Sequence, residues 1–258
     1  MRMAVAAATV VLLTTGPVLA DQAADLIAGK IKQCRGCDLQ GANFKKADLA
    51  GVDLTGANLT DATFHRANLR GAILTGVTAI GTNFNLADLT QAHMADGNFT
   101  RSMFYDALLS GADLSAADLA ETRMQEVRMT SAKLPAAVLD RAILHDAVLN
   151  NCDLTGASFQ ATNLERARVE RSNFSGATMY GVSLGKSLAS GADFSGATIT
   201  QTDFYGVDLR RTKFDHATVT ASRFTLAATD DGTFAGAVLT NNFMPNGRLQ
   251  AQGPSDGK

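Results

Sequence analysis

A five-residue repeat runs from Leu39 to Met244 and constrains this chain more than any other feature of its sequence. Every fifth residue in this interval is Leu, Phe, Ile, Met or Val, except Ala79, Ala189 and Thr229. A small residue precedes nearly every one of them by two positions, and the phase never slips. An uninterrupted period of this length predicts one solenoid that grows by stacking similar units.

Each unit consists of a small residue, commonly Asp or Asn next, then a large apolar residue and two variable residues. We number these positions 1 to 5; in the unit 42–46 they are Ala, Asn, Phe, Lys and Lys. A narrow coil has room for one large inward side chain on each side, so position 1 has to stay small. Each Leu or Phe buried at position 3 contributes about 1.5–3 kcal/mol, which builds a long core despite a thin cross-section.

The units 37–41 (Cys-Asp-Leu-Gln-Gly), 42–46 and 47–51 (Ala-Asp-Leu-Ala-Gly) resemble the pentapeptide repeat family, and the resemblance extends over residues 37–244. It implies an all-β fold, a right-handed quadrilateral parallel β-helix (a pentapeptide repeat solenoid) with one unit on each of four sides. About ten coils spaced about 4.8 Å apart would form a rod about 50 Å long. The repeat defines a scaffold, so the resemblance implies little about chemistry.

The phenylalanines test the four-sided arrangement independently. In a coil of four units, side chains twenty residues apart stack on one another, whereas a three-sided coil would stack residues fifteen apart. Seven Phe pairs are separated by twenty residues and two by fifteen, and ring stacking gives a physical reason for the preference. The pairs at twenty lie in the series Phe44, Phe64, Phe84, Phe104, in the series Phe174, Phe194, Phe214, Phe234, and in the pair Phe204 and Phe224.

Residues 1–20 are typical of a secretory signal peptide. Arg2 provides a positive start, residues 10–13 end an apolar run, and small residues up to Ala20 offer a cleavage site. A membrane-spanning anchor is the alternative, but the apolar run falls short of the about 20 residues that a span needs. We therefore expect export to the periplasm or the extracellular space, without membrane insertion after cleavage.

Residues 21–36 are predicted to form an N-terminal capping helix and a CxxC segment. Leu26, Ile27 and Ile31 recur at helical spacing within residues 21–33. A stack of repeats has an apolar end that must be covered. A short amphipathic helix at this place is therefore expected to act as a cap.

Cys34 and Cys37 are separated by two residues, a spacing found in redox pairs, zinc half-sites and local disulfides. A zinc site would need two more ligands nearby, and the adjacent sequence offers none. In an oxidising compartment a structural disulfide is the leading interpretation, and reduced thiols are the alternative. Cys152 occupies position 1 several coils away and is expected to be a buried small hydrophobe.

Two segments depart from the regular pattern. Residues 121–151 lose Asp or Asn at position 2 but keep the inward phase, so we expect a continuous coil with a local bend or bulge. Pro135 falls at position 4, at a corner that tolerates a missing N–H donor. After Met244 the period ends, and the Gly and Pro residues predict a disordered tail over 245–258.

The period also decides which exposed side chains share a side of the coil. Positions 4 and 5 after Phe44 and its equivalents carry many charged and aromatic residues, whereas those after Leu54 and its equivalents carry mostly Ser, Thr and Gly. We predict a protein-binding surface on the Phe44 side. The alternative is a solvated face whose charges only keep the protein soluble. The central residues of the predicted surface are Tyr105, Glu126, His145 and Arg166.

No arrangement for catalysis or metal binding is evident in the sequence. His65 and His145 share a side but are four coils apart, about 19 Å at strand spacing, which is too far for one metal ion. The Ser and Thr residues occupy repeat positions where hydrogen bonding in turns is their expected role. We therefore expect no catalytic residue, no metal and no cofactor.

These observations favour a secreted, non-enzymatic solenoid that binds an unidentified protein or serves as a structural element of the envelope, as a monomer or weak homodimer. The formal net charge of −2 gives no basic footprint for nucleic acid. The family resemblance implies one alternative, a DNA mimic that binds DNA gyrase and either inhibits it or protects it from quinolones. Such mimicry needs a strongly negative rod, whereas the Phe44 side carries charges of both signs.

Overall fold

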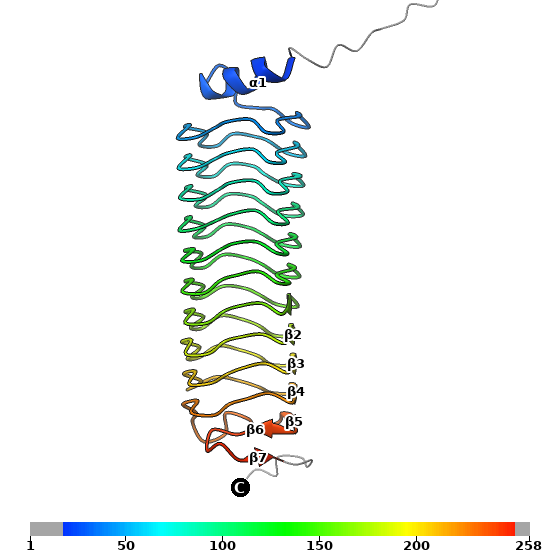
Figure 1. Cartoon of the computed structure of the whole chain (residues 1–258), viewed down its shortest axis with the longest axis vertical. Helices are drawn as coiled ribbons and strands as arrows, with labels where there is room; N and C mark the ends of the chain where they lie inside the picture. The colour runs from blue at the N-terminus through cyan, green and yellow to red at the C-terminus, as the bar shows by residue number, and fades with distance from the viewer. Residues whose placement is uncertain (1–17, 251–258) are drawn as a thin grey trace, which may run out of the picture.

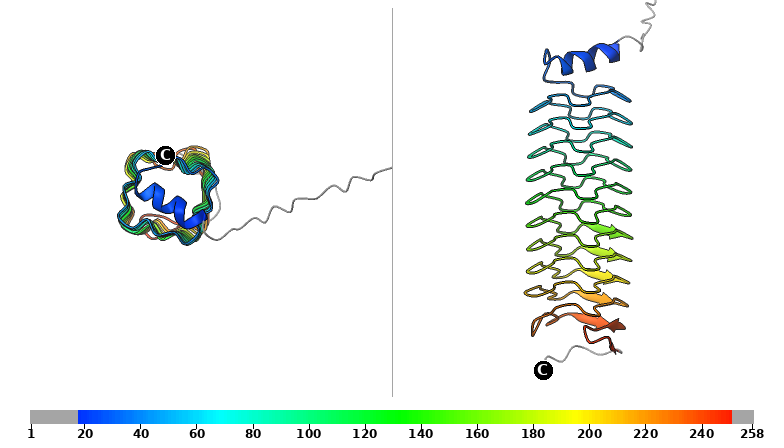
Figure 2. Two further views of the ribbon diagram at one scale, coloured as in Figure 1. Left: turned by 90° about the horizontal axis from the view of Figure 1, so that it is seen from above. Right: turned by 60° about the vertical axis from the view of Figure 1, so that its left-hand side comes forward.

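The computed structural model describes residues 18–250, which form a rod of stacked, four-sided coils (Figure 1). Seen along the rod, the coils superpose into a square outline (Figure 2). From Gln33 to Phe243, parallel bridges join residues twenty apart, so that four units complete one turn. The fold is therefore the expected right-handed quadrilateral parallel β-helix with one short N-terminal helix. We name its sides by their first regular position 3 residues: Leu39, Phe44, Leu49 and Leu54.

Backbone hydrogen bonds between coils explain why the repeat has five positions, as the unit 57–61 illustrates. Asn58 donates its N–H to the preceding coil (2.9 Å), while Leu59 and Asp61 donate theirs to the following coil (2.6 and 2.9 Å). Ala57 closes the corner by bonding to the position 3 carbonyl of the preceding unit (2.9 Å). Thr60 at position 4 bonds instead to the Asn58 side chain, at 3.1 Å. The side chain of Asp or Asn at position 2 thus accepts from the position 4 N–H, the one backbone donor of the unit that has no backbone acceptor.

The irregular segment 121–151 continues the same coil without a bulge. Its bridges, such as Arg123 to Ile143, keep the separation of twenty residues, and Figure 1 shows no bend there. The predicted bend or bulge is therefore wrong, because Asp and Asn at position 2 support the corner but do not set the register. Pro135 lies at position 4 and has no N–H to donate. Its presence there breaks no backbone hydrogen bond between coils, and Lys133 at position 2 of the same unit has no side-chain oxygen that could accept from position 4.

Within residues 18–250, regular strands occur only on the Leu39 side of the C-terminal half and at the C-terminal end. A parallel sheet stacks in the order β1 to β5, with a register of twenty residues between neighbours. A shorter antiparallel pair, β6 with β7, follows. The strands are β1 (Ser158–Gln160), β2 (Thr178–Tyr180), β3 (Thr198–Thr200), β4 (Thr218–Thr220), β5 (Val238–Thr240), β6 (Asn242–Phe243) and β7 (Leu249–Gln250).

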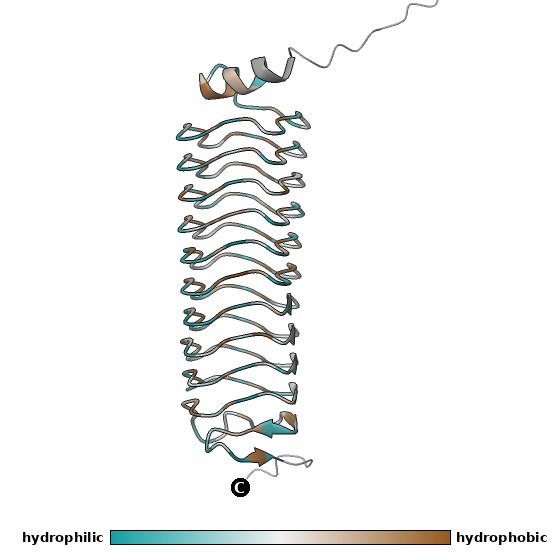
Figure 3. Ribbon diagram, viewed as in Figure 1, coloured by the Kyte–Doolittle hydropathy of each residue, from teal (hydrophilic) through white to brown (hydrophobic). Residues whose placement is uncertain are grey.

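Inward side chains form one continuous core, and hydrophobic and hydrophilic residues are interspersed along the coils (Figure 3). All seven Phe pairs at a separation of twenty residues contact, with ring centroids 5.3 Å apart or less. Phe194 stacks between Phe174 and Phe214, at 4.8 and 5.1 Å. These ladders confirm the prediction of four sides.

Position 1 is small for a reason that Gly97 makes explicit. A Cβ atom added to Gly97 would lie 2.5 Å from Cε2 of the Phe99 ring, closer than carbon atoms can approach. The ring of Phe99 also packs edge-on against Phe84 and Phe104, at 6.1 and 6.0 Å. The large side chain at position 3 therefore takes the space in front of position 1, as overpacking predicts.

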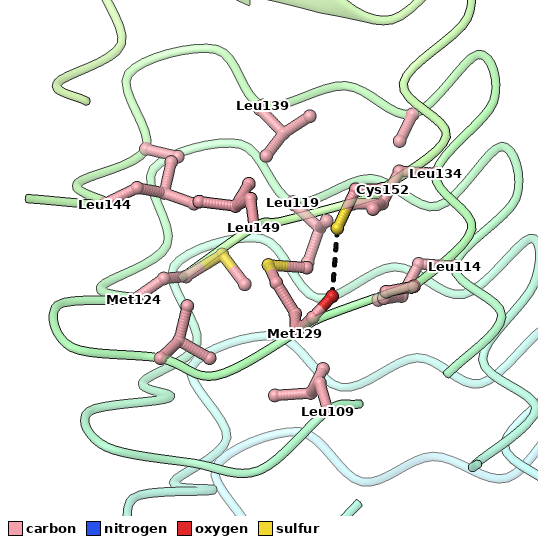
Figure 4. Close-up of a cluster of buried hydrophobic side chains, with 14 of the residues drawn as sticks. Leu109, Leu114, Leu119, Met124, Met129, Leu134, Leu139, Leu144, Leu149 and Cys152 are labelled. Atoms are coloured by element: carbon pink, nitrogen blue, oxygen red, sulfur yellow. Dashed lines mark hydrogen bonds between the residues drawn. The ribbon is translucent and has the colours of Figure 1, made fainter. Parts of the chain in front are cut away.

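Several polar residues at position 1 form hydrogen bonds inside the coil, whereas the buried hydroxyl of Ser187 has no partner among the described residues. Cys152 lies among Leu and Met side chains, and its Sγ donates to the carbonyl oxygen of Met129 at 2.9 Å (Figure 4). Burial raises the pKa of this thiol to about 12. The hydroxyls of Thr82 and Ser172 likewise donate to backbone carbonyls, at 2.7 and 2.5 Å. Cys152 is thus a buried, neutral, space-filling residue.

The N-terminal helix α1 (Val18–Ile27) lies across the end of the stack (Figure 1). Leu26 is buried against the core, whereas Ile27 is 47% exposed. Gly29 adopts a left-handed conformation (φ 67°), which ends the helix well before the predicted limit at residue 33. The cap is observed, but it begins and ends earlier than predicted. Its first turn overlaps the predicted signal peptide, of which residues 1–17 lie outside the described residues.

The coil begins one unit earlier than the predicted start at Cys37. Cys34 occupies position 3 of a first unit and donates its N–H to the following coil at 2.8 Å. Cys37 occupies position 1 of the next unit, so the two cysteines meet across a corner. They form a disulfide with a Cα–Cα distance of 5.3 Å. This bond closes the first corner of the coil, directly below the capping helix.

The C-terminal end opens at the one position 3 that is polar. Thr229 is half-buried, and residues 231–236 form turns in place of a regular side. Beyond them, β6 and β7 pair through a hairpin in which Met244 N–H donates to Arg248 at 2.9 Å. The prediction of disorder is therefore wrong for residues 245–250, while residues 251–258 lie outside the described part of the chain.

Candidate binding surface

The four residues of the predicted surface follow one another at a single corner of the Phe44 side. Tyr105 and His145 occupy position 4, and Glu126 and Arg166 occupy position 5. They come from four successive coils, because bridges on this side join residues twenty apart. The backbone at position 5 has a positive φ, 59° at Glu126 and 55° at Arg166, which turns the corner outward. The side chains are therefore presented by a hydrogen-bonded scaffold and not by a loop.

Tyr105 and Glu126 form the first contact within this surface. The Tyr105 hydroxyl donates to Oε1 of Glu126 at 3.3 Å, and the tyrosine side chain remains 44% exposed. The negative charge of Glu126 raises the pKa of Tyr105 above its ordinary value. The phenol is thus neutral at physiological pH and can accept or donate further hydrogen bonds.

His145 and Arg166 meet through a third residue, Asp146. Arg166 donates to both carboxylate oxygens, with Nε to Oδ1 at 2.8 Å and Nη2 to Oδ2 at 2.6 Å. Nδ1 of His145 lies 2.9 Å from Oδ2 of the same carboxylate. These hydrogen bonds, first that of Arg166 and then that of His145, hold the pKa of Asp146 well below its usual range. The bidentate pair fixes the orientation of both partners.

Tyr105 and His145 also line a shallow hollow of about 310 Å³. Met103 contributes an apolar floor and Arg123 an exposed guanidinium, both from position 2 of the same side. The structure therefore brings Tyr105 and His145 together in one concavity. Glu126 and Arg166 do not line the hollow. Glu126 bonds to Tyr105, and Arg166 pairs with Asp146. The remaining residues that line the hollow are Asn85 and Gln125.

Asp146, Met103 and Arg123 are the residues of this surface that the sequence prediction missed. Asp146 was recognisable, because it lies at position 5 exactly one coil before Arg166 and directly follows His145. Met103 and Arg123 replace Asp or Asn at position 2, and that departure from the repeat is a signal for a specialised face. The side-chain orientations that create the hollow have no counterpart in the repeat pattern.

The Leu54 side shows how an undecorated side differs. At Thr55 and Thr155 both the N–H and the hydroxyl at position 4 donate to the Asp at position 2, with hydroxyl distances of 2.5 and 2.6 Å. Ser115 repeats this geometry at 2.5 Å. These three hydroxyls are thus bonded within their own turns, as predicted.

The described residues offer little for catalysis or metal binding. Within residues 18–250 no group of three His, Cys, Asp or Glu side chains is placed to hold a metal ion. In that same part of the chain His145 has no hydrogen bond to a hydroxyl or thiol nucleophile. None of the helices described there is long and apolar enough to cross a membrane.

Known proteins resemble this chain both in sequence and in fold. The family model for pentapeptide repeats matches 8 copies, over residues 37–76, 82–120, 107–146, 122–160, 152–188 and 190–225. No curated protein sequence matches significantly. The solved structure of HetL, a pentapeptide repeat protein involved in heterocyst differentiation regulation in the cyanobacterium Nostoc, is similar with a TM-score of 0.71. That alignment has 21% identity and covers 84% of this chain and 91% of HetL.

A second solved structure is that of QnrB1, a plasmid-mediated fluoroquinolone resistance protein, in a trypsin-treated form. It aligns with 22% identity over 77% of this chain and 92% of QnrB1, with a TM-score of 0.35. At 21% identity the HetL structure bears on the fold alone.

Proposed function

This chain belongs to the pentapeptide repeat family, and from that premise we propose that it is an exported, non-enzymatic solenoid whose Phe44 side binds a protein partner. The observation that carries the proposal is the hollow that Tyr105 and His145 line together on the Phe44 side. A scaffold function agrees with the fold, because each coil contacts only its neighbours and leaves its corners free to vary.

The composition of the hollow supports recognition of a protein. Tyr, Met and Arg are enriched in protein interfaces, and all three meet here in Tyr105, Met103 and Arg123. The ion pair of Asp146 with Arg166 borders the hollow and is fixed before any partner arrives. Preorganised side chains lower the entropy lost on binding, which favours affinity from a small surface.

The charges on this side argue against the gyrase-binding alternative. Arg166 and Asp146 neutralise one another, as do Arg223 and Asp203 farther along the same side, with N–O distances of 2.6 and 2.5 Å. A mimic of DNA would instead need a continuous negative surface, because phosphate charges dominate recognition of DNA. We therefore expect the proposed partner to bind through local contacts of complementary shape and charge, and not through long-range electrostatic attraction.

Export is proposed on two grounds. The segment 1–20 has the order of features of a signal peptide. The Cys34–Cys37 disulfide fits an oxidising compartment such as the periplasm or the extracellular space. Separation from cytoplasmic DNA gyrase would follow from this location.

The double substitution Tyr105→Ala and His145→Ala is expected to abolish partner capture from an envelope extract while leaving the fold intact. Both side chains line the hollow and neither is part of the core, so thermal unfolding should change little. The measurement is affinity capture with immobilised protein, followed by mass spectrometry of the bound proteins.

The matched control is the double substitution Tyr180→Ala and His216→Ala, which removes the same two side-chain types from other sides of the rod. It should capture the same partner as the unsubstituted protein. Equal capture by both double variants would contradict the proposed surface. Fractionation of cells that express the full chain tests export separately, and retention in the cytoplasm would favour the gyrase alternative.

A further inference from the structure

A second hollow, of about 240 Å³, lies on the Leu49 side of the rod, away from the proposed protein-binding surface. It spans three successive coils, with Arg171 in the first, Ser190 and Gly191 in the second and Arg211 in the third. Glu170 is the remaining residue that lines it. Unlike the hollow beside Tyr105, this one contains no large apolar side chain.

The two arginines that line the hollow differ from their neighbours in what they contact. Arg168 is paired with Glu170 at 3.0 Å and Arg210 with Asp208 at 2.7 Å, so these charges are neutralised. Arg171 donates from Nε to the amide oxygen of Asn151 at 2.9 Å, and no ion pair forms between it and a carboxylate of residues 18–250.

Arg211 has the same kind of environment. Its Nη2 donates to the hydroxyl of Ser190 at 3.1 Å, a neutral acceptor inside the hollow. Its backbone N–H donates to Oδ2 of Asp230 at 2.5 Å, but Asp230 does not line the hollow, and the guanidinium forms no ion pair with any described carboxylate. Two guanidinium groups that form no ion pair within residues 18–250 therefore flank one polar concavity.

The coil geometry places these groups around a single point. Coils about 4.8 Å apart put the levels of Arg171 and Arg211 about 10 Å from one another, with Ser190 midway between them. Gly191 has no side chain to occupy that middle level, and the stem of Arg171 packs above it, since a Cβ on Gly191 would lie 3.4 Å from Arg171 Cγ. A compact anion at this level can receive hydrogen bonds from the coils on both sides.

We propose that this hollow binds a phosphate or sulfate group, held between the guanidinium groups of Arg171 and Arg211 and the hydroxyl of Ser190. Arginine is suited to tetrahedral oxyanions, because its planar fork matches two oxygens at once. The oxygens of such an anion point in several directions, so they can accept hydrogen bonds from donors on three different coils. Arg168 donates two hydrogen bonds to the Glu170 carboxylate, so this carboxylate is paired outside the position proposed for the anion. The group belongs either to a soluble phosphate or sulfate ester or to a phosphate at a lipid surface.

The test is titration of the isotopically labelled protein with inorganic phosphate at constant ionic strength, followed by NMR of the amide groups of Ser190 and Gly191. Saturable shifts at these two amides are expected, with sulfate giving the same response and chloride none. The double substitution Arg171→Gln and Arg211→Gln should weaken binding at least 10-fold. The matched control, Arg66→Gln with Arg101→Gln, removes the same charge from other corners and should bind like the unsubstituted protein.

Two results would overturn the proposal. One is a linear, unsaturated response to phosphate at Ser190 and Gly191. The other is equal weakening by both double variants, because the effect would then reflect net charge alone. Sedimentation with vesicles that contain phosphatidic acid, compared with pure phosphatidylcholine vesicles, identifies the source of the group. Binding that depends on Arg171 and Arg211 indicates a lipid phosphate, and binding of free phosphate without vesicle binding indicates a soluble ester.

Discussion

Replacing Phe194 with Ala is expected to lower the free energy of unfolding by about 3–5 kcal/mol, the range for truncation of a fully buried aromatic side chain. Phe194 stacks on Phe174 and Phe214 and meets Phe204 edge-on at 6.0 Å, so its removal leaves a cavity that three other aromatic rings border. Backbone hydrogen bonds between the coils hinder collapse of that cavity. Urea unfolding followed by circular dichroism measures the change.

Tyr180→Ala provides the control for this prediction. Tyr180 is an aromatic residue in a neighbouring coil, but it is 48% exposed, and its loss should change the free energy of unfolding by about 0.5 kcal/mol or less. Similar losses for Phe194→Ala and Tyr180→Ala would mean that the Phe ladder is not the core of the coil.

Proline substitutions within the unit 72–76 are expected to separate two of the five positions. Ile73 at position 2 donates its N–H to the preceding coil at 2.8 Å, so Ile73→Pro removes a bond between coils and should cost about 3 kcal/mol or more. Thr75→Pro should cost far less, because the N–H of Thr75, at position 4, forms no backbone hydrogen bond with a neighbouring coil. Pro135 occupies that same position in another unit. Thermal unfolding of the two variants gives the comparison, and equal losses would contradict the assigned hydrogen-bond pattern.

Much of the fold was predictable because one physical constraint repeats along the chain. A coil of fixed circumference must bury one large and one small side chain on each side, and the sequence records that requirement at every fifth residue. The Phe series at a spacing of twenty added the number of sides. Even Pro135 was placed correctly, since its missing donor matters only where a neighbouring coil needs it.

The ends of the coil were predicted less well, because the repeat does not determine them. Gly29 ends the capping helix through its left-handed conformation, although the apolar spacing continues to Ile31. Cys34 occupies position 3 of the first unit, where most other units have a large apolar residue. The first unit was therefore not recognised as part of the repeat and was assigned to the CxxC segment. At the other end β7 pairs with β6 in spite of the Gly and Pro residues around it.

The candidate surface was predictable in its location but not in its contacts. The period placed Tyr105 and His145 on one side, as the structure does, yet the central role of Asp146 depends on the direction of three side chains. For the same reason Arg171 and Arg211 escaped the sequence analysis. Their positions at the same corner, two coils apart, follow from the period, but only the structure separates them from the paired Arg168 and Arg210.

Both proposed binding sites require that residues twenty apart in the chain are neighbours in space. Hydrogen–deuterium exchange of the backbone amides, resolved by NMR, tests this requirement most directly. The hydrogen bonds between coils predict slow exchange at positions 2, 3 and 5 and the fastest exchange at position 4, repeated every five residues across the rod. Protection without a five-residue period would contradict the four-sided coil and both binding sites.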